Sequence, residues 1–423
     1  MQEKGGCMGA TGVDNALAPH GGPFTERVLD PSEGAKAIKG LTSVEVRGQI
    51  ATECMGLAYG FFAPLTGFMK SDDVDGVAKA MKLASGYVWS VPILFDLSPD
   101  HSAEAGITEG QTILLTYQGQ PLATMDVEEI YDYDKSFLAG QIYGTTEDAH
   151  PGVRRTFAYQ DRFLGGPITL VNPPQLSEPF NQFFFTPAQM RASFEELGWK
   201  KVVAYQSRNV PHVGHEWLMK SAWFASGADG VLVSAVIGEK KVGDSIDEAV
   251  ILGQDMLREG GYFLPDVHKT SILLWDMRYA GPREAVFHAL VRKNLGCTHH
   301  MFGRDHAGVG KYYDPYAAHR IFEEIPDIGI KPVLTLEWFY CPRCGPGYER
   351  LCGHQDQKDP ISGTWIRGLI AEGKQPDQQK FRTEVFDTML QAGRDYGDGS
   401  PFVSEEYLQN RNPVLRVPPF AAS

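Results

Sequence analysis

From Lys200 onward, short apolar runs alternate with segments of helical periodicity, and this alternation constrains the fold more than any other feature of the chain. The predicted strands are Val202–Tyr205, Gly230–Val236, Ser271–Trp275 and His299–Phe302; the predicted helices are His215–Ala225, Asp247–Arg258, Pro282–Lys293 and Pro315–Glu324. Strands and helices that alternate in this way form a parallel sheet with crossover helices. The sequence therefore predicts a doubly wound α/β domain whose ligands bind at the carboxyl ends of its strands.

The residues between about 41 and 179 are instead rich in β-strand signals. Ile113–Tyr117 and Leu122–Ile130 flank a glycine turn at Gly119, which predicts a hairpin. Val91–Phe95 is a further predicted strand. We expect a compact, mostly-β domain here.

Domain limits follow from the next helix signal. Thr186-Pro187 predicts a helix that runs through Leu197 and ends at Gly198. We therefore expect a multidomain α/β chain with a mostly-β domain over residues 1–185, a nucleotide domain over 186–340 and a small C-terminal α/β tail over 341–423. The tail includes a predicted helix over Gly363–Ala371, and Met1–Ala18 is expected to be poorly ordered.

Charge and composition exclude several classes of partner. The 423 residues include 53 acidic and 39 basic side chains, which gives a net charge of −14. Such a surface repels nucleic acid and acidic membranes, and no apolar run is long enough for a membrane span, so we expect neither partner. The six cysteines are unevenly spaced, unlike a secreted disulfide framework, which indicates a cytoplasmic protein.

The segment QSRNVPHVGH follows the first predicted strand of the nucleotide domain. Its polar residues are Gln206, Ser207, Arg208, Asn209, His212 and His215. Two histidines three residues apart lie on one side of a helix's first turn and can donate to phosphate oxygens, and the fork of Arg208 matches a tetrahedral dianion. The alternatives are a metal-binding histidine pair, histidines that only cap the helix, and a surface arginine. The segment predicts an anion site.

A second segment, Gly303–Gly310 (GRDHAGVG), follows a later strand. Its glycines flank Arg304 and expose successive backbone N–H groups, which is typical of an anion-binding nest. Because both segments follow parallel strands, we expect them to converge into one cationic site. The chain has no Walker A loop, which argues against a P-loop kinase.

Three cysteines and a histidine lie within fourteen residues of one another: Cys341, Cys344, Cys352 and His354. This set has the composition of a tetrahedral zinc site. A disulfide or a redox pair is the alternative, but the expected cytoplasmic setting and the lack of a βαβ context argue against both. Because protein ligands fill all four positions, we expect a structural metal.

Together these motifs resemble the ATP sulfurylase (sulfate adenylyltransferase) family, in its single-function prokaryotic type with a zinc-binding cysteine cluster. The resemblance covers nearly the whole chain. Pro19–Gly22 and Phe62–Phe68 resemble the family's N-terminal PUA-like domain, Met277–Glu284 joins the two anion motifs in resembling its nucleotidyltransferase domain, and Ser362–Arg367 resembles its zinc-bearing tail. One departure is Ser207, which stands where many members have threonine.

The resemblance implies that ATP and sulfate, with magnesium, give adenosine 5′-phosphosulfate and pyrophosphate. It implies that Gln206, Arg208 and the backbone of Ala307 bind sulfate. The implied catalytic residues are Ser207, Arg208, Asn209, His212 and His215. The implied ATP contacts are Gln206, Arg208, Asn209, His212, His215, Gly303, Arg304, Asp305, His306 and Leu336.

Two other functions stay open at this point. One is another nucleotidyltransferase with an HxGH motif, and the other is an RNA-binding β domain with a zinc knuckle. The metal is zinc or cobalt, the physiological direction of the reaction is open, and a homo-oligomer, dimer or trimer, is expected for an enzyme of this size.

Overall fold

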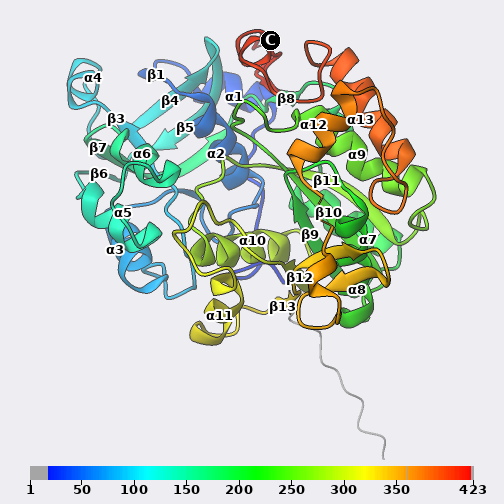
Figure 1. Ribbon diagram of the computed structural model, residues 1–423. Helices are drawn as coiled ribbons and strands as arrows, with labels where there is room; N and C mark the ends of the chain where they lie inside the picture. Colours follow the sequence, from blue (N-terminus) through cyan, green and yellow to red (C-terminus); the bar gives the residue numbers. More distant parts are fainter. Residues whose placement is uncertain (1–17, 360, 421–423) are drawn as a thin grey trace, which may run out of the picture.

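The computed structural model describes residues 18–359 and 361–420 (Figure 1). The segment predicted to be poorly ordered lies outside these residues, apart from Ala18. Within the described residues, no helix is long and apolar enough to cross a membrane.

The N-terminal part is built on a seven-stranded sheet with the order β1-β4-β5-β7-β2, in which β3 and β6 also pair with β7. Its strands are β1 (Ser43–Glu45), β2 (Gly67–Phe68), β3 (Phe95–Leu97), β4 (Thr112–Tyr117), β5 (Gln120–Asp126), β6 (Glu129–Tyr131) and β7 (Arg162–Leu170). Its helices are α1 (Pro31–Ala37), α2 (Gly48–Ala58), α3 (Ser71–Ala80), α4 (Pro99–Glu104), α5 (Lys135–Tyr143) and α6 (Pro151–Phe157). The sheet was predicted, and the helices around it were not.

The predicted hairpin is confirmed as β4 and β5. Gln118 and Gly119 at its tip both have positive φ, 55° and 70°, as a type I′ turn requires. Two predicted boundaries are wrong. The second strand does not continue to Ile130, because β5 ends at Asp126 and Glu129–Tyr131 forms a separate strand, β6, which pairs with an earlier part of β7 than β5 does. The strand expected at Val91–Phe95 begins only at Phe95, since the apolar side chains before it are buried in irregular structure.

The second part holds the predicted parallel sheet, with the order β11-β10-β9-β12-β13. Its strands are β9 (Val202–Ser207), β10 (Gly230–Ile237), β11 (His268–Leu274), β12 (His299–Phe302) and β13 (Lys331–Leu334). Its helices are α7 (Pro187–Glu196), α8 (Val213–Ser226), α9 (Asp247–Glu259), α10 (Pro282–Asn294) and α11 (Ala317–Glu324). The doubly wound fold is confirmed. Strand β13, at the edge of the sheet, was not predicted.

Helix α10 joins the two parts and lies between their sheets (Figure 1). Its Phe287 packs at 5.5 Å from Phe62 and 5.8 Å from Trp89, both of the N-terminal part, and at 4.4 Å from Trp275 (distances between ring centroids). All four rings are buried, so the contact is an extension of the core. The sheet that carries the anion motifs is therefore fixed against the N-terminal part.

The tail contains the hairpin β14 (Trp338–Cys341) and β15 (Gly345–Tyr348), then α12 (Gly363–Ala371), α13 (Thr383–Asp395), α14 (Glu405–Asn410) and β16 (Leu415–Arg416), which pairs with β8 (Gln175–Leu176). Short 3-10 turns lie at Phe180–Gln182 and Gln355–Gln357. Arg382 before α13 donates to both carboxylate oxygens of Glu216 in the first turn of α8, at 2.8 and 3.1 Å. The tail is thus attached to the helix that bears the histidine pair.

Candidate active site

The strand order explains why the two anion motifs meet. Strands β9 and β12 are neighbours, and the order of the sheet reverses between them. Loops that follow such a pair diverge to opposite faces and leave a crevice at the carboxyl edge, where doubly wound sheets bind ligands. The motif 206–215 leaves β9, and the motif 303–310 leaves β12.

A cavity of about 310 Å³ occupies this crevice. Its lining residues are Tyr205, Gln206, His212, Gly214, His215, Leu218, Met301, Gly303, Arg304, His306, Leu336, Glu337 and Trp338. We call it the histidine cavity. Residues of both motifs line this cavity together with Leu336, but Arg208 is not among them, so the structure does not bring both arginines into one cationic site as predicted. Trp338 and Glu337 were not predicted, because they belong to the start of the cysteine-bearing hairpin rather than to an anion motif.

The histidine pair caps helix α8 and keeps one ring nitrogen free on each side chain. His212 Nδ1 accepts from the N–H of Gly214 at 3.0 Å, and His215 Nδ1 accepts from the N–H of His212 at 3.3 Å. Each Nδ1 is therefore unprotonated, and the ring hydrogen of the neutral imidazole is on Nε2. Burial lowers the pKa of His215 to about 4 and that of His212 well below its usual value, so both rings are neutral N–H donors at pH 7. Capping and phosphate donation, treated above as alternatives, use different nitrogens of the same rings.

Gly214 allows Trp338 and His212 to pack closely against the first turn of α8. A Cβ at Gly214 would lie 2.4 Å from the ring of Trp338 and 2.7 Å from that of His212. Any other residue would push the indole away from the start of α8. The space at Gly214 is thus filled by an aromatic ring of the protein.

Polar side chains of the cavity lining form a hydrogen-bonded layer with His288, which is fully buried. Gln206 Nε2 donates to His288 Nδ1 at 3.0 Å, and His306 Nε2 lies 3.1 Å from the same atom. Burial lowers the pKa of His306 to about 3, and that of His288 well below its usual value. The layer therefore fixes Gln206 and His306 in place without adding charge. His288 was not predicted as a site residue, because a single histidine within a helix belongs to no recognisable motif.

Arg208 is not among the residues that line the histidine cavity. Its Nη1 donates to the hydroxyl of Tyr279 at 2.5 Å, and its Nη2 donates to the carbonyl of Glu239 at 3.0 Å. Tyr279 lines a neighbouring cavity of about 500 Å³, together with Arg155 and Lys241. In the structure, Arg208 and Arg304 are therefore not in the same cavity.

Ser207 and Asn209 shape the turn between strand and helix. The hydroxyl of Ser207 is 3.1 Å from both the backbone N–H and the carbonyl of Asn209, and Gln254 also donates to that carbonyl at 3.0 Å. Both residues thus hold Arg208 in position through the backbone.

The second motif forms a partly closed nest. Asp305 and Ala307 both have a φ of 54°, as alternating left-handed residues in such a loop do. Two of its N–H groups are already used, since Asp305 donates to the carbonyl of Pro315 and Gly308 donates to that of Asp305. Arg304 is partly exposed and pairs with Asp305 at 2.8 Å, so its guanidinium remains accessible at the cavity wall.

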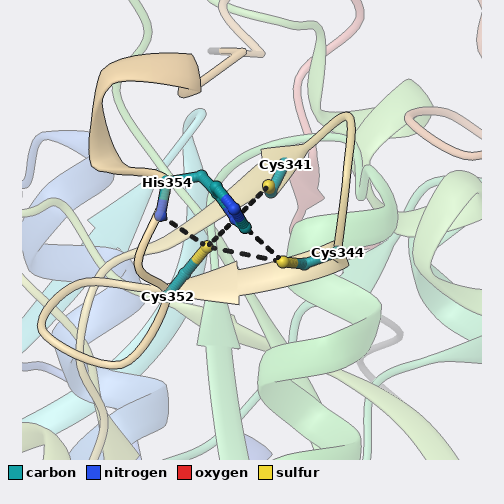
Figure 2. A group of neighbouring side chains, drawn as sticks. All are labelled: Cys341, Cys344, Cys352 and His354. Carbon is teal, nitrogen blue, oxygen red and sulfur yellow. Dashed lines mark hydrogen bonds between the residues drawn. The ribbon is translucent and has the colours of Figure 1, made fainter.

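The tail holds the predicted ligand set in one place (Figure 2). The ligand atoms of Cys341, Cys344, Cys352 and His354 all lie within 4.8 Å of one another. His354 Nδ1 is 3.2 Å from the sulfur of Cys344 and 3.8 Å from those of Cys341 and Cys352. These separations suit a tetrahedral ion with bonds of about 2.0–2.3 Å, and three thiolates with one imidazole are ligands that zinc prefers. The donor set therefore fits a structural metal.

Comparison with known proteins is consistent with this arrangement. Residues 181–392 match the ATP-sulfurylase family, and residues 17–173 match the PUA-like domain family. A sulfate adenylyltransferase of Archaeoglobus fulgidus is 38% identical over 94% of this chain and 96% of its own length, and one of Ignicoccus hospitalis is 40% identical over 88% and 97%. The solved structure of a hexameric APS kinase from Thiobacillus denitrificans has the same fold, with a TM-score of 0.69 at 20% identity over 90% of this chain and 69% of that one.

Proposed function

Because the chain belongs to the ATP-sulfurylase family, we propose that the converging loops after β9 and β12 transfer the adenylyl group of ATP to sulfate. The chain is a nucleotidyltransferase and acts as a sulfate adenylyltransferase. The observation that carries the site assignment is the histidine cavity, in which two neutral imidazoles with free Nε2–H groups face Arg304 across a switch point of the sheet.

In this proposal, a sulfate oxygen attacks the α-phosphorus in line with the departing pyrophosphate. Sulfate is fully ionised at neutral pH, so the step needs no general base, and catalysis rests on alignment and on stabilisation of charge. His212 and His215 donate through Nε2 to the β- and γ-phosphates as charge develops there, while Arg304, Asp305, His306, Gly303 and Leu336 hold the nucleotide. Magnesium enters with ATP as part of the substrate.

Sulfate is assigned to Gln206, Arg208 and the backbone of Ala307. Arg208 already spends two N–H groups on Tyr279 and Glu239, so binding sulfate exchanges at least one of these contacts for a sulfate oxygen. Ser207 and Asn209 support this step by fixing the turn. The assignment predicts that sulfate binds at the boundary between the histidine cavity and the cavity beside Tyr279.

The decisive experiment measures pyrophosphate release from ATP with and without sulfate. Release that depends on sulfate supports the proposal, and release that needs a carboxylate or another acceptor favours a different HxGH nucleotidyltransferase. Arg208→Ala should lower kcat/KM for sulfate by about 10²–10³-fold, as loss of a charge-stabilising donor does. Arg320→Ala, at an exposed arginine of α11, is the control. An unchanged rate in Arg208→Ala would refute the role of Arg208.

An RNA-binding role is the weaker alternative. The net charge of −14 opposes it, and an electrophoretic shift with RNA at physiological salt would be needed to support it.

We also propose that the metal is zinc or cobalt and that the chain forms a homo-oligomer, dimer or trimer, in the cytoplasm. Phe224 on α8 is 82% exposed beside Trp223, and exposed apolar groups of this kind are typical of an interface. The similar fold of a hexameric protein is consistent with assembly. Light scattering coupled to gel filtration measures the state directly, and a monomer would contradict it.

A further inference from the structure

The hairpin that bears Cys341 and Cys344 also contributes to the histidine cavity, because its first residue, Trp338, lines that cavity. Trp338 opens β14, and Cys341 ends the same strand. Trp338 pairs with Tyr348 at the open end of the hairpin, and Cys341 pairs with Gly345 at its tip. We call residues 338–348 the metal hairpin. One short element thus has metal ligands at one end and a cavity residue at the other.

The indole of Trp338 is held against the histidine pair. Its ring centroid lies 6.1 Å from that of His212 at an interplanar angle of 33°, and His212 in turn stacks on His215 at 3.8 Å. Gly214 leaves the room for this approach. The indole Nε1–H is buried and has no acceptor, a cost that proteins accept mainly where function requires it.

Polar contacts of Tyr348, and of Glu337 just before the metal hairpin, attach this segment to its surroundings. The hydroxyl of Tyr348 bonds to that of Ser221 on α8, the helix that His212 caps. Glu337 lies 3.8 Å from Arg304 and 3.4 Å from Lys358, measured between nitrogen and oxygen atoms. The position of the indole therefore depends on how the hairpin is held, and a metal bound by the cysteine cluster would hold its other end.

We infer that Trp338 is a nucleotide-positioning residue whose placement depends on the metal bound by Cys341, Cys344, Cys352 and His354, so that metal occupancy sets the affinity for ATP. The inference rests on the proposed function, because it takes a purine nucleotide as the ligand of the histidine cavity. An indole beside a nucleotide cavity offers a flat apolar face on which a purine or ribose stacks. Loss of the metal frees the tip of the hairpin and loosens that face.

The test is a cycle of metal removal and substitution, with the affinity for α,β-methylene-ATP measured by calorimetry on the full chain. In the metal-loaded protein, Trp338→Ala should weaken binding by about tenfold, as loss of a stacking partner does. Trp338→Phe should stay within about threefold, since it keeps a ring. Trp365→Ala, at a partly buried tryptophan of α12 outside the cavity, should bind as the wild type does.

Chelation of the metal should weaken binding to the wild type by a similar factor and should change little in Trp338→Ala, because coupled perturbations are not additive. Losses that multiply, or changes below twofold in both proteins, would overturn the inference. Circular dichroism checks that each form is folded. If chelation unfolds the chain, Tyr348→Phe loosens the same hairpin with the metal in place, and an affinity equal to that of the wild type would then refute the coupling. Sulfate-dependent pyrophosphate release by the wild type would stand in either case, which separates this inference from the proposed function.

Discussion

His215 has two separable tasks, and two amide substitutions, each of which replaces one ring nitrogen, distinguish them. Its Nδ1 accepts the backbone N–H of His212 at 3.3 Å, while its Nε2–H is the donor assigned to the phosphates. Asparagine places an oxygen acceptor where Nδ1 lies and removes the distal donor. Glutamine places an N–H donor where Nε2 lies and removes the cap.

His215→Asn should lower kcat by about 10²–10³-fold, equivalent to about 2.7–4 kcal/mol of transition-state stabilisation, because a donor aimed at developing charge is lost. Its free energy of unfolding should stay within about 0.5 kcal/mol of the wild type, since the cap is retained. His215→Gln should keep kcat within about tenfold and lose about 0.5–1 kcal/mol of stability, the low end of the range for a cap, because the capping bond is long.

Three measurements on each variant test these two roles of His215: the initial rate of pyrophosphate release, the affinity for α,β-methylene-ATP, and the free energy of unfolding from urea denaturation. Wild-type turnover in His215→Asn would refute the donor role. A loss of nucleotide affinity with kcat unchanged would show that the imidazole binds ground and transition states alike. If His215→Gln were as inactive as His215→Asn, the reasoning from the two nitrogens would fail.

Other predictions concern the surroundings of the site. Arg278 and Glu53 form a buried ion pair between the two parts of the chain, with side chains 3% and 2% exposed; Glu53→Gln should therefore cost about 3–5 kcal/mol in urea denaturation, and a double substitution by apolar residues should cost less than either single one. Burial lowers the pKa of His268 from 6.5 to about 4, so the unfolded chain binds a proton that the folded one does not, and stability is lost as pH falls from 6.5 towards 4. His268→Leu should remove about 1.2 kcal/mol of the stability change between pH 7 and 5.5, and an unchanged pH dependence would contradict this. Elemental analysis should find about one zinc or cobalt ion per wild-type chain and little in Cys352→Ser, and equal metal content would argue against the site.

The sequence predicted correctly those parts of the fold whose structure depends on residues close together in the chain. The helix start at Thr186-Pro187 and the turn at Gly119 depend on neighbours a few residues away, and both occur as predicted. Three of the helices missed in the N-terminal part, α1, α4 and α6, have only 7, 6 and 7 residues, which is too short for a periodic pattern to show. Strand β13 was missed because its residues are largely exposed at the edge of the sheet.

The sequence by itself determined the chemical groups of the site, the parallel sheet that brings two distant loops to one edge, and the four metal ligands. These follow from residue types and short spacings, which act through local geometry. Only the tertiary structure decided that Arg208 rests on Tyr279, that His288 fixes Gln206, and that Trp338 reaches the histidine pair 126 residues earlier in the chain. Such contacts depend on how separate elements pack, and no short stretch of sequence encodes that.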